Sequence, residues 1–277
     1  MSKDRPTVEI VNNKIKHNNV TIFFGVPTLY AAMLNSNLKP EDFKSLRLSV
    51  SAGEALPEHL CNKWRKTIGS NVLDGIGSTE MLHIFISNYI DLITPGSSGK
   101  PVPGYEVRLI KDDNSEAVTD EIGELEVKGP TSAISYWNKP EKTKATFIGD
   151  WVKTGDKYTK DANGIYKYCG RSDDMMKVSG QYVSPFEIEE ALQSHKHVLE
   201  AAVVGKKDKD ELLKPKAFVV LNDQNNERNL EKELTKHVKK ILTPFKYPRW
   251  YEFVTSLPKT ATGKIQRYKL RIENENY

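Results

Sequence analysis

The chain has 277 residues, enough for more than one compact unit at roughly 100–200 residues per domain. Its 38% hydrophobic and 28% charged residues are typical of a globular protein and exclude a disordered or fibrous chain. The formal net charge is only +4, from 41 basic and 37 acidic residues. This dispersed excess argues against a nucleic-acid partner, which usually brings a clustered basic stripe, but it permits a phosphate-bearing ligand.

The two cysteines and the apolar runs bear on the compartment. Cys61 and Cys169 match no metal-binding spacing and fit a reducing environment. Residues 1–7 lack the apolar core of a secretory signal, and no apolar run reaches the roughly 20 residues that span a bilayer. We therefore expect a cytoplasmic protein without a membrane partner.

Residues 1–95 alternate helical and strand patterns. Apolar spacing predicts helices near residues 8–15, 29–34 and 57–68 and short strands over 20–24, 46–51 and 72–73. Strand–helix–strand alternation implies a parallel sheet covered by helices.

The pattern changes near Gly96. Alternating apolar residues around 105–109 and 125–127, with a turn at 161–164, predict a small antiparallel β unit. Gly-Ser-Ser-Gly-Lys at residues 96–100 looks like a phosphate loop. It precedes no predicted helix, so we interpret it as a structural turn.

A compact α+β domain is predicted after residues 171–174. Ser184 and Glu187 form a capping box with Pro185 at the first helical position. Predicted strands over 201–204, 217–221 and 251–254 flank an amphipathic helix over 230–241, which ends before Pro244.

The most informative stretch is Asp-Gly-Ile-Gly-Ser-Thr-Glu-Met-Leu-His at residues 74–83. Its glycines allow close backbone approach, and a hydroxyl and a carboxylate stand side by side. Such a turn can hold a nucleotide phosphate and its magnesium, although alone it is equally a helix N-cap followed by a surface glutamate.

Four ordered blocks then carry a resemblance. They are Gly-Ser-Thr-Glu at 77–80, Trp-Val-Lys-Thr-Gly-Asp at 151–156, Gly-Arg-Ser-Asp-Asp-Met-Met-Lys-Val-Ser-Gly at 170–180, and Pro-Lys-Thr-Ala-Thr-Gly-Lys-Ile at 258–265. Ser-Ala-Gly-Glu at 51–54 and Gly-Glu-Leu-Glu-Val at 123–127 support them. From about Thr21 to Arg267 the chain resembles the acyl-adenylate-forming enzymes, which include acyl-CoA and aryl-CoA synthetases, adenylation domains and firefly-type luciferases.

The resemblance implies both the reaction and the architecture. A carboxylate attacks the α-phosphorus of ATP with Mg²⁺, and a thiol, usually that of coenzyme A, then displaces AMP to give a thioester. The implied fold is α/β with a small antiparallel β-barrel subdomain, followed by a separate α+β C-terminal domain. The implied bounds are 1–95 for part of the α/β subdomain, 96–172 for the barrel-like subdomain and 173–277 for a mobile C-terminal domain.

The resemblance also implies roles for five polar residues. Thr79 contacts the α-phosphate, Glu80 helps to hold Mg²⁺, and Asp156 accepts hydrogen bonds from the ribose. Arg171 is a second ribose or phosphate contact, and Lys264 is the lysine essential for adenylation. Taken singly, Asp156 is equally a turn aspartate, Arg171 a surface ion pair and Lys264 a solvated lysine. The implied wall of the adenine pocket consists of Gly53, Glu54, Ala55, Asp74, Gly75, Gly77 and Ser78.

Two further features concern coenzyme A. Asp173 aligns with the hinge about which the C-terminal domain rotates, with a one-residue ambiguity because Asp174 follows it. The tunnel for the pantetheine arm would be lined by Lys177, Ser179 and Gly180, which are otherwise an ordinary turn before the capped helix.

The stretches 23–34 and 79–88 resemble benzoate-type and hydroxybenzoate-type CoA ligases. The resemblance implies an aryl pocket lined by Phe24, His83 and Ile84. A flat aromatic acid suits such an apolar slot, while short aliphatic acids stay open because such slots discriminate weakly. His83 is alternatively a satisfied, semi-buried histidine.

Two segments typical of the family do not occur in the sequence. They are the Ser/Thr/Gly-rich phosphate loop and the large N-terminal subdomain. We therefore expect a C-terminal portion of such an enzyme, completed by an N-terminal chain or self-associated as a homodimer. The alternatives are a non-catalytic remnant that binds adenylate or coenzyme A, and an adenylation domain for another acyl acceptor.

Overall fold

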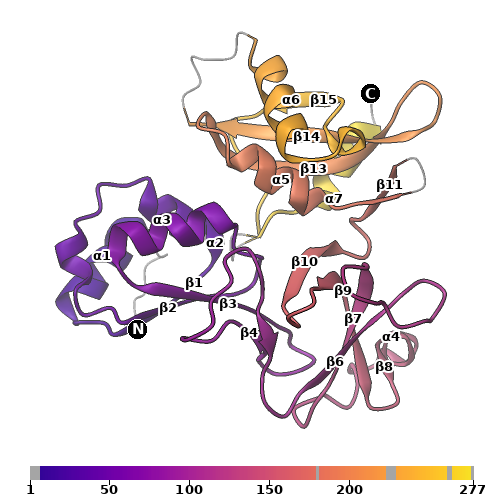
Figure 1. The fold of residues 1–277 in the computed structure, drawn as a ribbon, viewed down its shortest axis with the longest axis horizontal. Coiled ribbons are helices and arrows are strands. Elements are labelled where there is room, and N and C mark those ends of the chain that lie inside the picture. Colours follow the sequence, from indigo (N-terminus) through magenta and orange to yellow (C-terminus); the bar gives the residue numbers. More distant parts are fainter. Residues whose placement is uncertain (1–6, 179–180, 223–228, 261–263, 276–277) are drawn as a thin grey trace. The chain divides into compact units, whose positions relative to one another are not determined.

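The computed structural model describes residues 7–178, 181–222, 229–260 and 264–275 (Figure 1). The chain divides into two compact units, Met1–Tyr168 and Cys169–Tyr277. Each unit has hydrophobic clusters of its own, and each is described by itself.

The first sheet of unit 1 has the strand order β1-β2-β3-β4-β5. The parallel strands are β1 (Ile22–Gly25), β2 (Leu48–Ser51) and β3 (Asn71–Gly77), as the alternating pattern predicts. The strands β4 (Ile84–Ser87) and β5 (Lys100–Pro101) continue the sheet in antiparallel pairing. Strand β4 was not among the strands predicted from the sequence.

Helices α1 (Val8–His17), α2 (Pro27–Leu34) and α3 (Glu58–Ile68), with a 3₁₀ turn at Pro40–Phe43, cover this sheet (Figure 1). Trp64 of α3 is fully buried, and its Nε1 donates to Ser49 Oγ at 3.1 Å and to Ser70 Oγ at 3.0 Å. The Tyr30 ring of α2 lies 4.7 Å from the Trp64 ring, and its hydroxyl donates to Val50 O at 2.9 Å. These buried contacts hold α2 and α3 against β2.

The second sheet of unit 1 has the order β10-β9-β7-β6, with β8 (Phe147–Ile148) on β9. Its strands are β6 (Glu106–Ile110), β7 (Gly123–Lys128), β9 (Trp151–Lys160) and β10 (Tyr166–Arg171), and α4 (Pro140–Thr146) precedes β8. Strands β6, β7 and β9 pair in antiparallel fashion around buried Leu109, Leu125 and Val152. The predicted antiparallel unit is therefore confirmed as a sheet, and its strand order among the described residues runs from β10 to β6.

Unit 2 contains a three-stranded sheet of order β13-β14-β15. Its elements are β11 (Met176–Val178), β12 (Gln181–Val183), α5 (Pro185–Gln193), β13 (Val198–Lys207), β14 (Leu213–Leu221), α6 (Leu230–Ile241), a 3₁₀ turn at Pro244–Lys246, β15 (Trp250–Phe253) and α7 (Arg267–Glu275). Alternate residues of β13 face opposite ways, so Val203 joins the cluster with α5 and α6 while Val204 joins the one with α7. This separate α+β domain agrees with the prediction.

The capping box of α5 forms as predicted. Ser184 Oγ accepts from Glu187 N at 3.0 Å, with Pro185 in the first turn. Helix α7 was not predicted. Arg267, the first residue of this helix, makes a bidentate ion pair with the buried carboxylate of Glu189. Its Nε donates to Oε1 at 3.0 Å and its Nη2 to Oε2 at 2.6 Å. Among the helices that the structure describes, none is long and apolar enough to cross a membrane.

Candidate functional site

Three parallel strands of unit 1 end at one edge of the sheet. Gly25, Ser51 and Asp74 are register partners on β1, β2 and β3. Open α/β sheets bind ligands at the carboxyl ends of their strands, because the following loops converge there. This edge therefore gathers Gly53, Glu54 and Ala55, which follow β2, and the turn that follows β3.

Asp74 is buried at this edge. Its Oδ2 accepts from Leu56 N at 3.3 Å, whereas Oδ1 and the neighbouring Ser51 Oγ are buried without a hydrogen bond among the described residues. Burial raises the pKa of the Asp74 carboxyl to about 8. An uncharged acid with an unsatisfied oxygen can exchange hydrogen bonds with a polar ligand edge such as a purine base.

Gly75 and Gly77 are required by strand pairing. A Cβ atom on Gly77 would lie 2.3 Å from His83 O of the adjoining chain, and one on Gly75 would lie 2.7 Å from Ile86 O of β4. The sequence indicated close approach to a ligand. The close approach that the structure contains is to the neighbouring backbone.

Residues 79–83 form turns and bends, so the helix N-cap interpretation of Thr79 does not hold. Ser78 Oγ accepts from Met81 N at 3.3 Å, which tightens the turn. Thr79 is exposed and Glu80 is half-buried. Burial alone would raise the pKa of the Glu80 carboxyl, but hydrogen bonds from Tyr136 and Ser78, with Lys142 nearby, hold that pKa below its usual range. Glu80 is therefore an ionised carboxylate at neutral pH.

Tyr136 was missed by sequence reasoning. Its hydroxyl donates to Glu80 Oε1 at 2.5 Å. The backbone of the same segment is joined to the turn, because Ala133 N donates to Glu80 O and Thr131 Oγ1 to Met81 O, both at 2.7 Å. No local spacing could reveal this contact, since 56 residues separate Tyr136 from Glu80.

Asp156 lies nearly buried on β9 of the second sheet, where its backbone N donates to Thr154 Oγ1 at 3.1 Å. Burial raises the pKa of the Tyr158 hydroxyl, and the nearby carboxylates of Asp156 and Asp74 raise that pKa further. Asp156 and Asp74 thus both act on one buried phenol, which brings the predicted ribose and adenine residues close together. Ser98, in the glycine-rich turn at 96–100, hydrogen-bonds Tyr158 Oη at 3.0 Å, and the turn leads into β5 rather than a helix.

Two of the three residues predicted for the acid pocket lie on strands. Phe24 lies on β1 and is 65% exposed, Ile84 begins β4, and exposed His83 immediately precedes it. Strands β2 and β3 lie between β1 and β4 in the sheet.

In unit 2, Arg171 is exposed and its Nε lies 3.9 Å from Asp173 Oδ1. Lys177 is exposed, with its ammonium 4.9 Å from the ring centroid of Tyr182 on β12. Ser179 and Gly180 lie outside the described residues. Lys264 is exposed, and both its N and its O hydrogen-bond Thr260, at 3.1 Å to Oγ1 and 2.8 Å to N.

Asp173 and Asp174 have different surroundings. The side chain of Asp173 is largely exposed, whereas that of Asp174 is mostly buried and is paired with Arg271 and Arg267 of α7. Asp174 is therefore fastened into unit 2. Of the two candidates for the hinge, Asp173 is the one whose backbone can turn without breaking a buried ion pair.

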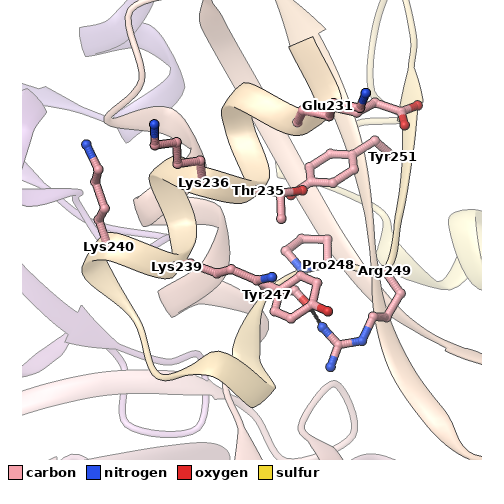
Figure 2. A pocket seen from close by; sticks show the side chains of 10 residues that line it. Glu231, Thr235, Lys236, Lys239, Lys240, Tyr247, Pro248, Arg249 and Tyr251 are labelled. Atoms are coloured by element: carbon pink, nitrogen blue, oxygen red, sulfur yellow. Dashed lines mark hydrogen bonds between the residues drawn. The ribbon is translucent and has the colours of Figure 1, made fainter. Parts of the chain in front are cut away.

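A basic groove of about 600 Å³, also missed by sequence reasoning, lies along α6 (Figure 2). Lys232, Lys236, Lys239, Lys240 and Arg249 supply its positive charge. The ammonium of Lys239 lies 3.9 Å and the Arg249 guanidinium 3.5 Å from the centroid of the Tyr247 ring. The spacing of lysines on the polar side of α6 was the signal that could have revealed it.

The comparisons with known proteins identify the family of the chain. The model of the AMP-binding enzyme family matches residues 1–137, and that of the AMP-binding enzyme C-terminal domain matches residues 187–264. The chain is 56% identical over 271 residues to a benzoate–CoA ligase of Thauera aromatica, covering 97% of this chain and 51% of that protein. It is 50% identical over 272 residues to a 4-hydroxybenzoate–CoA/benzoate–CoA ligase of Rhodopseudomonas palustris, covering 97% and 50%.

Solved structures give the same result. The anthranilate CoA ligase AuaEII in complex with anthranoyl-AMP matches with a TM-score of 0.95 and 47% identity, over 99% of this chain and 54% of that chain. A benzoate CoA ligase from Burkholderia xenovorans LB400 matches with a TM-score of 0.90 and 48% identity, over 97% and 54%. The chain spans about half the length of the curated relatives it matches. It belongs to the AMP-binding enzyme family.

Proposed function

We propose that the chain carries the chemistry of an ATP-dependent aryl-CoA ligase. An aromatic carboxylate would attack the α-phosphorus of ATP and release pyrophosphate, and the thiol of coenzyme A would then displace AMP from the acyl-adenylate. The observation that carries the proposal is the turn after β3, where exposed Thr79 adjoins the ionised and hydrogen-bonded carboxylate of Glu80. In phosphoryl transfer the protein mainly positions groups and stabilises charge, and this turn offers both.

The nucleotide roles follow from position. Thr79 would donate to the α-phosphate, and nearly buried Asp156 would accept from the ribose hydroxyls. Asp74 and the backbone of Gly75, Gly77 and Ser78 would form the adenine wall with residues 53–55. Arg171 would add a second ribose or phosphate contact.

Magnesium fits the donor set. Mg²⁺ usually takes one or two carboxylates together with substrate phosphates. In the described ranges no cluster of three or more His, Cys, Asp or Glu side chains could hold a metal ion alone. Glu80, ionised and half-buried, is the side chain that would hold Mg²⁺, which supplies positive charge to the phosphates when bound.

Coenzyme A would bind along the basic groove of unit 2 (Figure 2). The four lysines and one arginine of the groove would pair with its diphosphate and its 3′-phosphate. Lys177, with Ser179 and Gly180, would line the path of the pantetheine arm. The ammonium of Lys264 would contact the oxygens that gain negative charge during adenylation. The C-terminal domain would then rotate about Asp173 before thioester formation.

The substrate would be a benzoate-type acid, with His83 and Ile84 in its pocket and Phe24 at its far side. Similarity to two relatives named for benzoate supports this class. We further propose the domain bounds 1–95, 96–172 and 173–277, with the curled antiparallel sheet as a barrel-like subdomain. A complementing N-terminal chain or a second copy would cover Ile22 and Phe24, which β1 leaves exposed.

Benzoate-dependent exchange of pyrophosphate into ATP by the purified chain tests this function. Exchange at enzyme-like rates would support the proposal and refute the alternative of a non-catalytic remnant. No exchange, with benzoyl-adenylate still bound in calorimetry, would favour the alternative of a non-catalytic adenylate-binding remnant. Absence of both would refute the proposal for this chain.

A further inference from the structure

Tyr136 contacts the carboxylate of the turn directly. Its hydroxyl donates to Glu80 Oε1 at 2.5 Å. Such a bond favours the rotamer of Glu80 that keeps Oε1 on the phenol, because a phenol has one proton to donate.

Tyr136 is itself held in place from two sides. Its backbone N donates to Thr143 Oγ1 of α4 at 3.0 Å, and its ring meets Phe147 edge-on at 5.5 Å. The ammonium of Lys142 lies 4.5 Å from the ring centroid. The hydroxyl is therefore presented by a ring whose orientation is set by packing rather than by its contact with Glu80.

The same segment also fixes the backbone of the turn. Ala133 N donates to Glu80 O, so the main chain and the side chain of one residue are each held by a donor from residues 131–136. Thr131 Oγ1 holds the next carbonyl, that of Met81, and also bonds Tyr105 Oη at 2.8 Å. A segment that served only to close the fold would have no need of the carboxylate contact.

We propose that Tyr136 is a positioning residue for the metal site, whose hydroxyl orients the Glu80 carboxylate toward a nucleotide-bound divalent cation. This inference rests on the proposed function. Hydrogen-bond partners of metal-binding carboxylates orient them, and their loss typically weakens metal affinity 10- to 100-fold.

Two matched variants of the full chain test the role. Tyr136→Phe removes the hydroxyl and keeps the ring contacts with Phe147 and Lys142. Tyr105→Phe removes the hydroxyl that bonds Thr131 in the same region, and so controls for loss of packing. Mn²⁺ binding in the presence of α,β-methylene ATP is measured by electron paramagnetic resonance, with thermal unfolding of each variant alongside.

We expect Tyr136→Phe to weaken Mn²⁺ binding at least about tenfold, with Tyr105→Phe within twofold of the unchanged chain. In exchange assays the concentration of Mg²⁺ at half-maximal rate should rise while the rate at saturating Mg²⁺ is retained. Equal Mn²⁺ affinity in both variants would overturn the inference and leave the proposed function standing. No nucleotide-dependent Mn²⁺ binding by the unchanged chain would overturn both.

Discussion

Lys264 is exposed, and its backbone is hydrogen-bonded to Thr260. The position of its backbone is therefore set, while its side chain can move the ammonium group. We expect Lys264→Ala to lower adenylate formation at least about 100-fold, the usual effect of removing one group that stabilises developing charge. Thioester formation from supplied benzoyl-adenylate should persist. Measuring the two half-reactions separately, with exposed Lys269→Ala as control, checks this. Equal loss in both would contradict the assigned role.

Asp74 should make the stability of unit 1 depend on pH. Its carboxyl has a pKa of about 8 when folded and an ordinary value near 3.8 when unfolded, so the folded state keeps a proton that the unfolded state releases. The contribution to stability is complete below pH 3.8 and is lost progressively as pH rises through 8.

Asp74→Asn should therefore remove this slope, since an amide cannot ionise and its oxygen can still accept from Leu56 N. Hydrogen exchange of the β2 and β3 amides at pH 5 and pH 8 measures the free energy of opening in each protein. Identical slopes in the two proteins would show that Asp74 is ionised in the fold.

At the scale of elements, the ion pair between Arg267 and Glu189 holds α7 on its sheet. Glu189 is almost fully buried and also accepts from Val203 N at 2.8 Å. Arg267→Met leaves that buried carboxylate without its bidentate partner, which should lower the free energy of unfolding of unit 2 by about 3–5 kcal/mol. Lys259→Met, which removes a more exposed pair with Glu200, should cost about 0–1 kcal/mol. Urea denaturation of unit 2 compares them, and equal costs would contradict the argument.

These elements also show which parts of the structure the sequence could predict. Helices α3 and α6 carry an apolar face at helical spacing, and the cap of α5 is local, so their residues suffice to identify them. Helix α7 has Leu270 as its buried apolar residue and is held by Arg267, which leaves no periodic pattern. The turn with Thr79 and Glu80 could be singled out because its residues are contiguous, and its phosphate role stays a prediction. Tyr136 and the basic groove depend on contacts between distant segments.

At the scale of the whole molecule, the two units have separate hydrophobic clusters and offer separate ligand chemistry. Unit 1 carries the turn with Thr79 and Glu80, and unit 2 carries the groove along α6. Coenzyme A should therefore bind unit 2 through its phosphates even where no adenylate forms, and this binding should weaken with salt because the charges are exposed.

The variant Lys236→Ala/Lys239→Ala/Arg249→Ala tests the groove. Each exposed charge near a phosphate is worth about 1 kcal/mol, so the three together should weaken coenzyme A binding roughly 100-fold. Benzoyl-adenylate binding to unit 1 should be unchanged. Calorimetry with both ligands at two salt concentrations measures these affinities, with Lys269→Ala on α7 as control. Undiminished coenzyme A binding would place its phosphates elsewhere, and a parallel loss of adenylate binding would mean that the two units do not act independently.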